Sequence, residues 1–282
     1  KAECKMLTFA IQTAIKNAAL EEEGIDLMIS GDLLNQIISA SFAARDFDFP
    51  FLGVYGACST MAESFALAAS LINAGYFKKI VAATGSHFSS AERQYRYPLE
   101  LGTTRPPQSQ WTVTGAGGAV IAEKGSHTAI TGATFGKVVD FGVTDVNNMG
   151  AAMAPAACDT ILTHLKDTGR GSDYYDLIVT GDLGALGSRI VKDLTWEKGV
   201  DIQPNHVDCG EIIYKVIEDE FQGGSGAGCS AVVFNSYIYD KLKRREINRV
   251  LFVATGALLS TVSSGQGESI PCIAHAVSIE NV

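Results

Sequence analysis

The chain carries the same motif twice, and this repetition limits what it can fold into. Residues 26–33 read Asp-Leu-Met-Ile-Ser-Gly-Asp-Leu, and residues 176–183 read Asp-Leu-Ile-Val-Thr-Gly-Asp-Leu. A second pair of segments, residues 57–85 and 228–256, aligns without a gap. Solenoid repeats are spaced by roughly 20 to 50 residues, and these copies lie much further apart, so each copy must be a large part of a domain.

A third pair of motifs supports the same division. It matches Thr-Gly-Ala-Gly at residues 114–117 with Ser-Gly-Gln-Gly at residues 264–267. No polar low-complexity linker separates the copies, and the length of the chain suits one large core. We therefore predict two α/β halves, residues 1–125 and 126–282, that form one compact unit.

The elements inside each copy predict the kind of sheet. A short apolar run at residues 27–30 is followed by an Ala- and Leu-rich segment, 59–74, which stops at Gly75 and leads into the apolar run 80–84. This order is typical of a strand, a helix with a glycine stop, and a second strand. The second copy repeats the order at residues 177–180, 230–245 and 250–254. Such units with right-handed crossovers form mostly parallel sheets covered by helices.

The two halves differ in what precedes the first shared motif. A β-rich stretch at residues 128–142 and a helix at residues 151–166 precede the second copy, whereas only a helix at residues 3–23 precedes the first. The first half thus lacks an opening strand. We expect that the chain begins inside a longer gene product whose N-terminal strand is not part of this sequence.

Charge and hydropathy exclude several classes of function. The formal net charge is −9, from 22 Lys plus Arg against 31 Asp plus Glu, and no basic run is interleaved with aromatic residues. These features disfavour binding to nucleic acid or directly to an anionic bilayer. There is no apolar run of about 18 residues or more, so we predict no membrane span, while docking on a membrane protein stays open.

The six cysteines form no recognisable metal or redox motif. None belongs to a Cys-x-x-Cys pair, and no histidine lies at a companion spacing. Zinc binding and thioredoxin-like chemistry are therefore disfavoured, and no EF-hand or carboxylate cluster predicts a calcium site. We predict free thiols, several of them buried, and neither a cofactor nor a metal site.

One cysteine, Cys58, occupies a position suited to chemistry. It lies between a turn of small residues, Gly56-Ala57, and the first turn of the predicted helix 59–74. Unpaired backbone N–H groups and the helix macrodipole at such a position favour a thiolate or a bound anion. The alternative is a buried structural cysteine, since Cys229 takes the corresponding place in the second copy.

These motifs together resemble the thiolase and ketoacyl-synthase superfamily. The resemblance is carried by the turn at Cys58, Val81-Ala-Ala-Thr-Gly-Ser86, residues 114–120 and Ser264-Gly-Gln-Gly-Glu-Ser269, and it spans nearly the whole chain. It implies a thiolase-like, internally duplicated α/β fold with α-β-α-β-α layers and mostly parallel sheets. It also implies a homodimer and, as in ketoacyl synthase III members, an active site of Cys, His and Asn.

The resemblance places the nucleophile on Cys58 but leaves the other two catalytic positions altered. Gly181 stands where the histidine is expected, and Ser225 stands where the asparagine is expected. In these enzymes both side chains donate hydrogen bonds to the enolate formed during condensation, and losing one such donor costs about 10²- to 10³-fold in rate. We therefore expect no enzymatic activity and a vestigial Cys58. The alternatives are a Cys58-dependent acyltransferase or thioesterase, and a purely structural subunit.

More detailed motifs resemble a family of stage V sporulation proteins of spore-forming Firmicutes. The motifs occupy residues 55–64, 103–108, 145–155 and 180–184. The resemblance implies a soluble component of the SpoVA system that binds pyridine-2,6-dicarboxylic acid (dipicolinic acid), alone or as its calcium chelate, for uptake into and release from the spore. It also implies integral-membrane SpoVA proteins as partners and a position at the inner membrane of the forespore.

Four residues are the predicted ligand contacts. Cys58 offers the backbone donors of a helix N-terminus to a carboxylate, and the small Gly181 and Ser225 open volume for an aromatic ring. His87 follows the predicted strand 80–84, at the sheet edge where α/β proteins hold ligands. A histidine bonded within its own loop is an equal alternative for His87.

Other polar residues have a weaker case. Because Asp32 mirrors Asp182 in the first copy, we expect Asp182 to cap a helix rather than to contact a ligand. The long loop after Ser86 contains Arg93, Arg96, Arg105 and Trp111. These side chains either bind a carboxylate and stack on a ring, or belong to a dimer interface.

Overall fold

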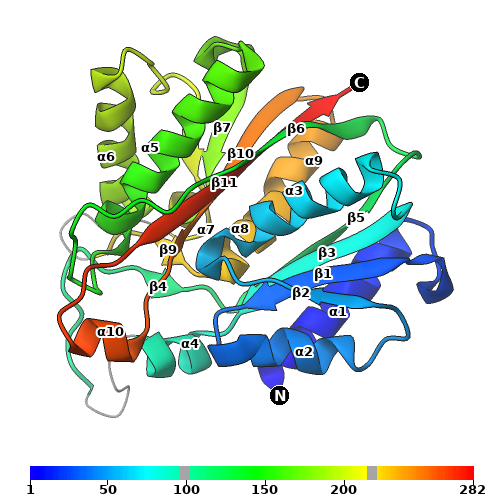
Figure 1. Ribbon diagram of the computed structural model, residues 1–282, viewed down its shortest axis with the longest axis horizontal. Helices are drawn as coiled ribbons and strands as arrows, with labels where there is room; N and C mark the ends of the chain where they lie inside the picture. Colours follow the sequence, from blue (N-terminus) through cyan, green and yellow to red (C-terminus); the bar gives the residue numbers. More distant parts are fainter. Residues whose placement is uncertain (96–101, 215–220) are drawn as a thin grey trace.

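The computed structural model describes residues 1–95, 102–214 and 221–282, and these residues form five layers. Two sheets alternate with three layers of helices, so that one helical layer lies between the sheets and one covers the outer face of each (Figure 1). This is the α-β-α-β-α arrangement that the resemblance implied.

The first sheet contains strands of the first half. Its order is β2 (Phe51–Gly53), β1 (Leu27–Asp32), β3 (Lys79–Ser86) and β5 (Gly115–Ala122). β1 pairs in parallel with β2 and β3, and β5 runs antiparallel to β3. Its outer face is covered by α1 (Ala2–Asn17) and α2 (Ile38–Ala44). Leu7, Ile11 and Ile15 of α1 are buried there because their spacing places them on one helical face.

The second sheet contains strands of the second half. Its order is β6 (Thr128–Phe135), β11 (Cys272–Asn281), β10 (Arg249–Ala257), β7 (Leu177–Thr180) and β8 (His206–Asp208). β7 pairs in parallel with β8 and β10, whereas β11 runs antiparallel to β10 and β6. The outer face is covered by α5 (Met149–Thr168) and α6 (Gly184–Glu197) (Figure 1).

The middle layer joins the two sheets through aromatic packing. It contains α3 (Thr60–Asn73), α8 (Ala227–Val233), a π-helical turn (Phe234–Ile238) and α9 (Tyr239–Lys243). The ring of Phe65 on α3 lies 5.5 Å from the ring of Phe234, which stacks at 4.5 Å on Phe252 of β10. Residues of both halves thus share one core, which makes the halves a single packed body.

Short elements connect the layers at the ends of the two sheets. A small two-stranded sheet pairs β4 (Trp111–Thr112) with β9 (Gly224–Ser225). The short helices are α4 (Phe88–Tyr95), α7 (Cys209–Ile213) and α10 (Thr261–Gly265). The 3₁₀ turns are Glu22–Gly24, Asn35–Ile37, Ala57–Ser59 and Ser172–Tyr174.

Both halves contain the predicted strand–helix–strand unit. β1, α3 and β3 repeat as β7, the α8–α9 segment and β10, with parallel pairing of the two strands in each half. The predicted glycine stop of α3 is present, since Gly75 has a φ of 79° that suits glycine. The predicted helices at residues 3–23 and 151–166 correspond to α1 and α5, although α1 ends at Asn17.

Two sequence predictions about the repeats were wrong. Residues 114–117 lead into β5, whereas residues 264–267 follow from the end of α10, so the third pair of motifs is not structurally equivalent. In the first half β5 pairs with β3, and in the second half the corresponding partner of β10 is β11. Glycine-rich tetrapeptides recur wherever turns are tight, which explains the false match. The β-rich stretch 128–142 forms a strand only as far as Phe135.

Candidate functional site

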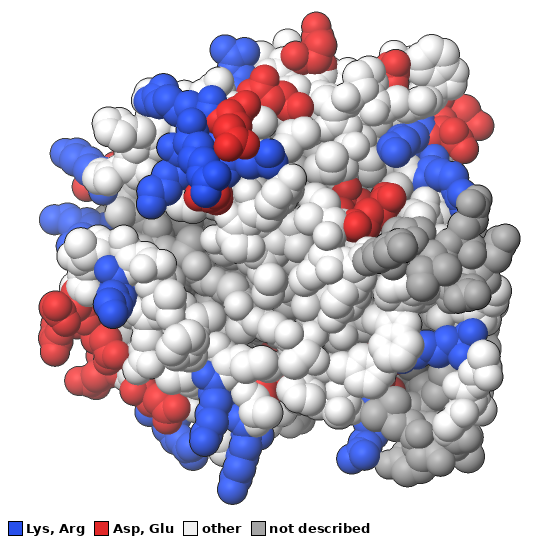
Figure 2. Space-filling view, turned by 180° about the vertical axis from the view of Figure 1, so that it is seen from behind, with Lys and Arg blue, Asp and Glu red and all other residues white. Residues whose placement is uncertain are grey.

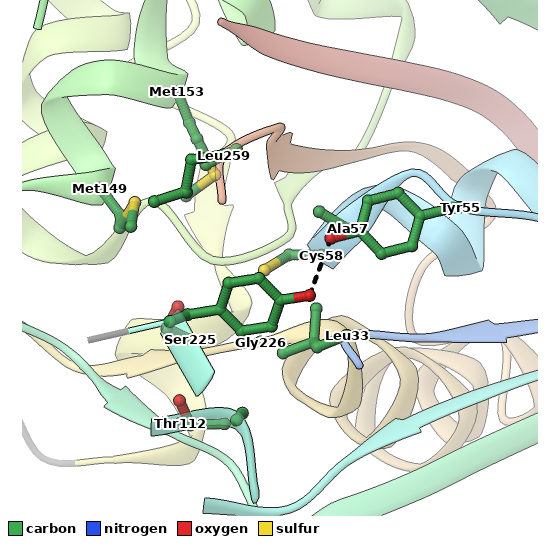
Figure 3. A pocket seen from close by; sticks show the side chains of 13 residues that line it. Leu33, Tyr55, Ala57, Cys58, Thr112, Met149, Met153, Ser225, Gly226 and Leu259 are labelled. Atoms are coloured by element: carbon green, nitrogen blue, oxygen red, sulfur yellow. Dashed lines mark hydrogen bonds between the residues drawn. The ribbon is translucent and has the colours of Figure 1, made fainter. Parts of the chain in front are cut away.

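A pocket of about 460 Å³, part of it open to solvent, lies around Cys58 where the two halves meet. First-half and second-half residues contribute to it in similar number. The lining residues are Leu33, Tyr55, Ala57, Cys58, Ala91, Tyr95, Thr112, Met149, Met153, Ser225, Gly226, Ala257 and Leu259. In Figure 3, Met149, Met153 and Leu259 form one side, Tyr55 lies opposite, and Cys58 lies between them. Two of the four predicted contacts, Cys58 and Ser225, therefore line one pocket.

The turn that presents Cys58 is sharp and strained. Ala57 has a φ of 51°, a left-handed conformation that side chains other than glycine rarely adopt. The turn is fixed by side chains of the following helix, because the hydroxyl of Ser59 donates to Gly56 O at 2.6 Å and that of Thr60 donates to Ala57 O at 2.7 Å. Gly256 of β10 passes so close that a Cβ there would collide with the carbonyl oxygen of Gly56. The second half thus holds the turn of the first.

The carboxylate of Asp182 lies directly behind this pocket and is fully buried. It accepts hydrogen bonds from the backbone N–H of Gly226 at 2.9 Å and from the hydroxyls of Thr255 at 2.9 Å and Ser225 at 3.2 Å. The Cys58 thiol also bonds to it. Burial raises the pKa of Asp182 above its usual value, and these hydrogen bonds oppose the rise. Three lining residues are thus directed towards one acidic group, and its negative charge opposes a thiolate at Cys58.

The expectation that Asp182 caps a helix was wrong, although its counterpart Asp32 does so. Asp32 accepts from the backbone N–H groups of Leu34 at 2.8 Å and Ala40 at 2.7 Å, at the start of α2. At the start of α6 the equivalent bonds go to Asp208, which accepts from Leu183 and Gly184, both at 2.9 Å. Because Asp208 of the neighbouring strand occupies the capping position, the Asp182 side chain turns towards Cys58 instead.

Gly181 does not open volume in the pocket and is not among its lining residues. A Cβ at this position would lie 3.0 Å from Ala254 Cα and 3.2 Å from Thr255 N. The small size of Gly181 therefore lets the end of β7 approach β10, and the predicted role was wrong. The next residue, Asp182, is the one that bonds to the Cys58 thiol.

His87 also lies outside the pocket lining. Its Nδ1 accepts from the backbone N–H of Ser89 at 3.2 Å, and its carbonyl accepts from Ala91 N at the start of α4. The loop-bonded alternative for His87 is therefore the correct one. The other four histidines of the chain, all within the described residues, also lie outside the lining. No imidazole is thus positioned to act as a base or donor beside Cys58.

The pocket contains two tyrosines and two methionines that the sequence analysis missed; Tyr55, Met149 and Met153 lie within its motifs, whereas Tyr95 does not. The hydroxyls of Tyr55 and Tyr95 lie 3.1 Å apart, the contact drawn as a dashed line in Figure 3. Burial raises the pKa of both groups, so the hydroxyls stay protonated and can donate. Met149 and Met153 supply an apolar wall from adjacent turns of α5. A four-residue spacing of apolar side chains in the 145–155 motif was the available signal for this wall.

The loop arginine Arg105 is bound within the protein rather than directed at the pocket. It forms an ion pair of 2.5 Å with the buried carboxylate of Glu92, and its guanidinium lies 4.6 Å from the ring of Trp111. Trp111 stacks on Phe88 at 5.2 Å and does not line the pocket. Of the two alternatives for this loop, a role in ligand binding is therefore not supported for Arg105 and Trp111. Arg96 lies outside the described residues.

The described residues hold no group of three or more His, Cys, Asp or Glu side chains arranged to bind a metal ion. The six cysteines, all within the described residues, form no disulfide, and Cys158, Cys209, Cys229 and Cys272 are buried, as predicted. Over the same residues, none of the helices combines the length and hydrophobicity that crossing a bilayer requires.

Comparisons with known proteins agree with this architecture. The family model of stage V sporulation protein AD (SpoVAD) matches residues 1–280. Stage V sporulation protein AD of Bacillus subtilis strain 168 is 48% identical over 279 residues, which cover 99% of this chain and 82% of that protein.

Solved structures with the same fold are condensing and acyl-transferring enzymes. AbyA1, a tetronic acid condensing enzyme, matches with a TM-score of 0.65 at 15% identity over 98% of this chain and 85% of its own. The 3-oxoacyl-[acyl-carrier-protein] synthase III of Aquifex aeolicus matches with a TM-score of 0.61 at 14% identity over 99% and 85%. ChlB3, an acyltransferase, gives 0.66 at 14% identity over 100% and 84%. At such identities these matches establish the thiolase-like fold alone.

Proposed function

Because this chain belongs to the stage V sporulation protein AD family, we propose that it serves sporulation by binding dipicolinic acid in the pocket at Cys58 and does not catalyse acyl condensation. The proposal rests on the residues that stand at the catalytic positions which the resemblance implied. The Cys58 thiol and the Ser225 hydroxyl both bond to Asp182, and no histidine lines the pocket. An enolate formed here would meet a buried carboxylate where the condensing enzymes need donors.

The chemistry of the pocket supports a small planar acid. Met149 and Met153 offer a polarisable apolar wall to an aromatic ring. The hydroxyls of Tyr55 and Tyr95, together with the N-terminal turn of α3 at Cys58, offer donors to a carboxylate.

Titration calorimetry of the purified chain with dipicolinate, with and without calcium, tests this function. We expect saturable binding and at least about tenfold weaker binding by Ser225→Val, which fills the pocket and removes a polar group. Ser236→Val is the matched control, since Ser236 is exposed and bonds only within its helix. Absence of saturation by dipicolinate and by its calcium chelate, with a cooperatively folded protein, would contradict the proposal.

A Cys58-dependent acyltransferase or thioesterase is the second candidate, because the strained turn at Ala57 still presents the thiol to the pocket. Incubation with acetyl- and malonyl-CoA followed by intact-protein mass spectrometry separates the two functions. The binding protein gives no acyl adduct, while an enzyme gives an adduct that Cys58→Ser abolishes. Iodoacetamide labelling of the same samples reports whether the thiol is accessible.

We also propose that the protein acts at the forespore inner membrane with integral-membrane SpoVA proteins. Lys and Arg side chains gather at the upper left of Figure 2. Because Figure 2 is turned by 180° from Figure 1, α9 and the start of β10 lie on this side. Lys243, Arg245 and Arg249 are exposed there. We expect Lys243→Glu with Arg245→Glu to stop co-purification with co-expressed SpoVA membrane proteins, and the exposed Lys16→Glu to leave it intact.

A homodimer is part of the same proposal. β2 is the edge strand of the first sheet, and no strand within the described residues pairs with its outer side. Ile38, Phe42 and Leu52 near this edge are 43%, 46% and 39% exposed, which suits a partner with apolar surface. Sedimentation velocity should show a dimer that Leu52→Lys dissociates, while Phe9→Lys, at a more exposed apolar site on α1, leaves it unchanged.

A further inference from the structure

The pocket offers no positive side chain to an acid. Within the described ranges, none of its lining residues is Lys, Arg or His. Behind the lining lies the carboxylate of Asp182, which is bonded to Cys58, Ser225 and Gly226. A carboxylate ligand in contact with Cys58 or Ser225 therefore comes close to a buried acid.

The other charged groups around the pocket do not compensate for Asp182. Glu92 on α4 is neutralised by Arg105. Asp32 at the end of β1 and Asp208 at the end of β8 are buried carboxyls without a cationic partner among the described ion pairs, and burial raises the pKa of Asp208 and of Glu63 on α3 to about 7. The N-terminal ends of α3 and of α8, which begins beside the lining residue Gly226, contribute partial positive charge. The surroundings are thus net acidic.

We propose that the pocket takes up a proton together with its carboxylate ligand, and that Asp182 is the group that accepts it. The inference rests on the proposed function. A ligand anion close to Asp182 repels the negative charge of the carboxylate and so raises the pKa of that carboxyl further, on top of the rise caused by burial.

The bonding around Asp182 can accommodate the proton. In the free protein the Asp182 carboxylate accepts from two hydroxyls, those of Ser225 and Thr255. A hydroxyl can both donate and accept, so a protonated Asp182 can donate to Ser225 Oγ. The Ser225 hydroxyl then turns its own hydrogen towards the pocket. Asp182 thus gains an O–H bond by taking a proton from solvent, and the Ser225 hydroxyl becomes a donor to the ligand carboxylate.

The direction of the pH effect follows from linkage. Asp182 has a higher pKa in the complex than in the free protein, so the affinity for the ligand rises as pH falls. The rise is up to about tenfold per pH unit and occurs between these two pKa values of Asp182. Below the pKa of the free protein the affinity becomes constant. The calcium chelate brings less net negative charge and should show a weaker pH dependence.

Calorimetry at one pH in two buffers of different ionisation enthalpy measures the proton directly. With dipicolinate between pH 6 and 8 we expect uptake of a substantial fraction of one proton. The neutral pyridine-2,6-dicarboxamide should bind without uptake. Asp182→Asn should abolish the uptake, flatten the pH profile and bind dipicolinate at least about tenfold more tightly at pH 8, whereas Asp167→Asn, at an exposed site, should behave as wild type.

The outcomes separate this inference from the proposed function. Saturable binding of dipicolinate without proton uptake, at an affinity independent of pH, overturns the inference and leaves the proposed function standing. Uptake that persists unchanged in a folded Asp182→Asn variant shows that another group takes the proton, which also overturns it. Failure to bind at any pH overturns both.

Discussion

Arg105 Nη2 lies 2.5 Å from Glu92 Oε2, and the side chain of Glu92 is completely buried. The other carboxylate oxygen of Glu92 accepts from the backbone N–H of Thr112 at 3.2 Å and from its hydroxyl at 2.7 Å. Thr112 lines the pocket and pairs with Ser225 through the β4–β9 bridge. This ion pair therefore positions one wall of the site, although neither partner lines it.

Removal of the arginine should be costly. In Arg105→Ala the buried Glu92 carboxylate loses its 2.5 Å ion pair with the guanidinium, and we expect a loss of about 3 to 5 kcal/mol in the free energy of unfolding, measured with urea. Arg244→Ala is the control, because its 2.7 Å pair with Asp240 is exposed and should contribute less than about 1 kcal/mol. Equal losses in the two variants would show that the buried pair has no special role.

Glu63 should make stability depend on pH. Burial raises its pKa to about 7 from an ordinary 4.5, and its Oε2 has no hydrogen-bond partner among the described residues. The stability that the neutral carboxyl contributes is fully present below about pH 4.5 and is lost as pH rises to about 7. Glu63→Gln should therefore gain about 1 to 2 kcal/mol over wild type between pH 5 and pH 8, after allowance for partial solvent screening. Urea unfolding at both pH values, with the exposed Glu123→Gln as control, tests the sign.

Gly181 should matter for packing and not for ligand affinity. The added methyl group in Gly181→Ala meets the backbone of β10 at 3.0 to 3.2 Å, so we expect a destabilisation of about 1 to 3 kcal/mol. Gly265→Ala meets nothing within 4 Å and should be nearly neutral. If Gly181→Ala instead weakened ligand binding while thermal unfolding stayed unchanged, the glycine would be a pocket residue after all.

The two tyrosine hydroxyls should contribute to binding. Tyr95→Phe and Tyr55→Phe each remove one donor from the pocket, and we expect an affinity about 2- to 12-fold weaker, corresponding to about 0.5 to 1.5 kcal/mol. Tyr76→Phe, at a site 75% exposed, is the matched control. Calorimetric affinities equal to wild type in both pocket variants would remove the hydroxyls from the site.

Local sequence determined most of the elements. The apolar runs that predicted strands 27–30 and 80–84 became β1 and β3, and the Ala- and Leu-rich segment between them became α3, which ends before Gly75. Burial and helix-stop chemistry act within a few residues, so these patterns can be read from one stretch of chain. The position of Cys58 at a turn before a helix was visible for the same reason.

Which side chains meet at the site was decided by tertiary structure. Asp32 and Asp182 occupy matching places in the repeated motif, yet only Asp32 caps a helix, because Asp208 arrives from a separate strand and takes that role in the second half. Asp182 then faces Cys58, a residue of the other half. A motif specifies what its neighbours in sequence can bond to, whereas the partner of a buried carboxylate depends on strands brought together only by packing.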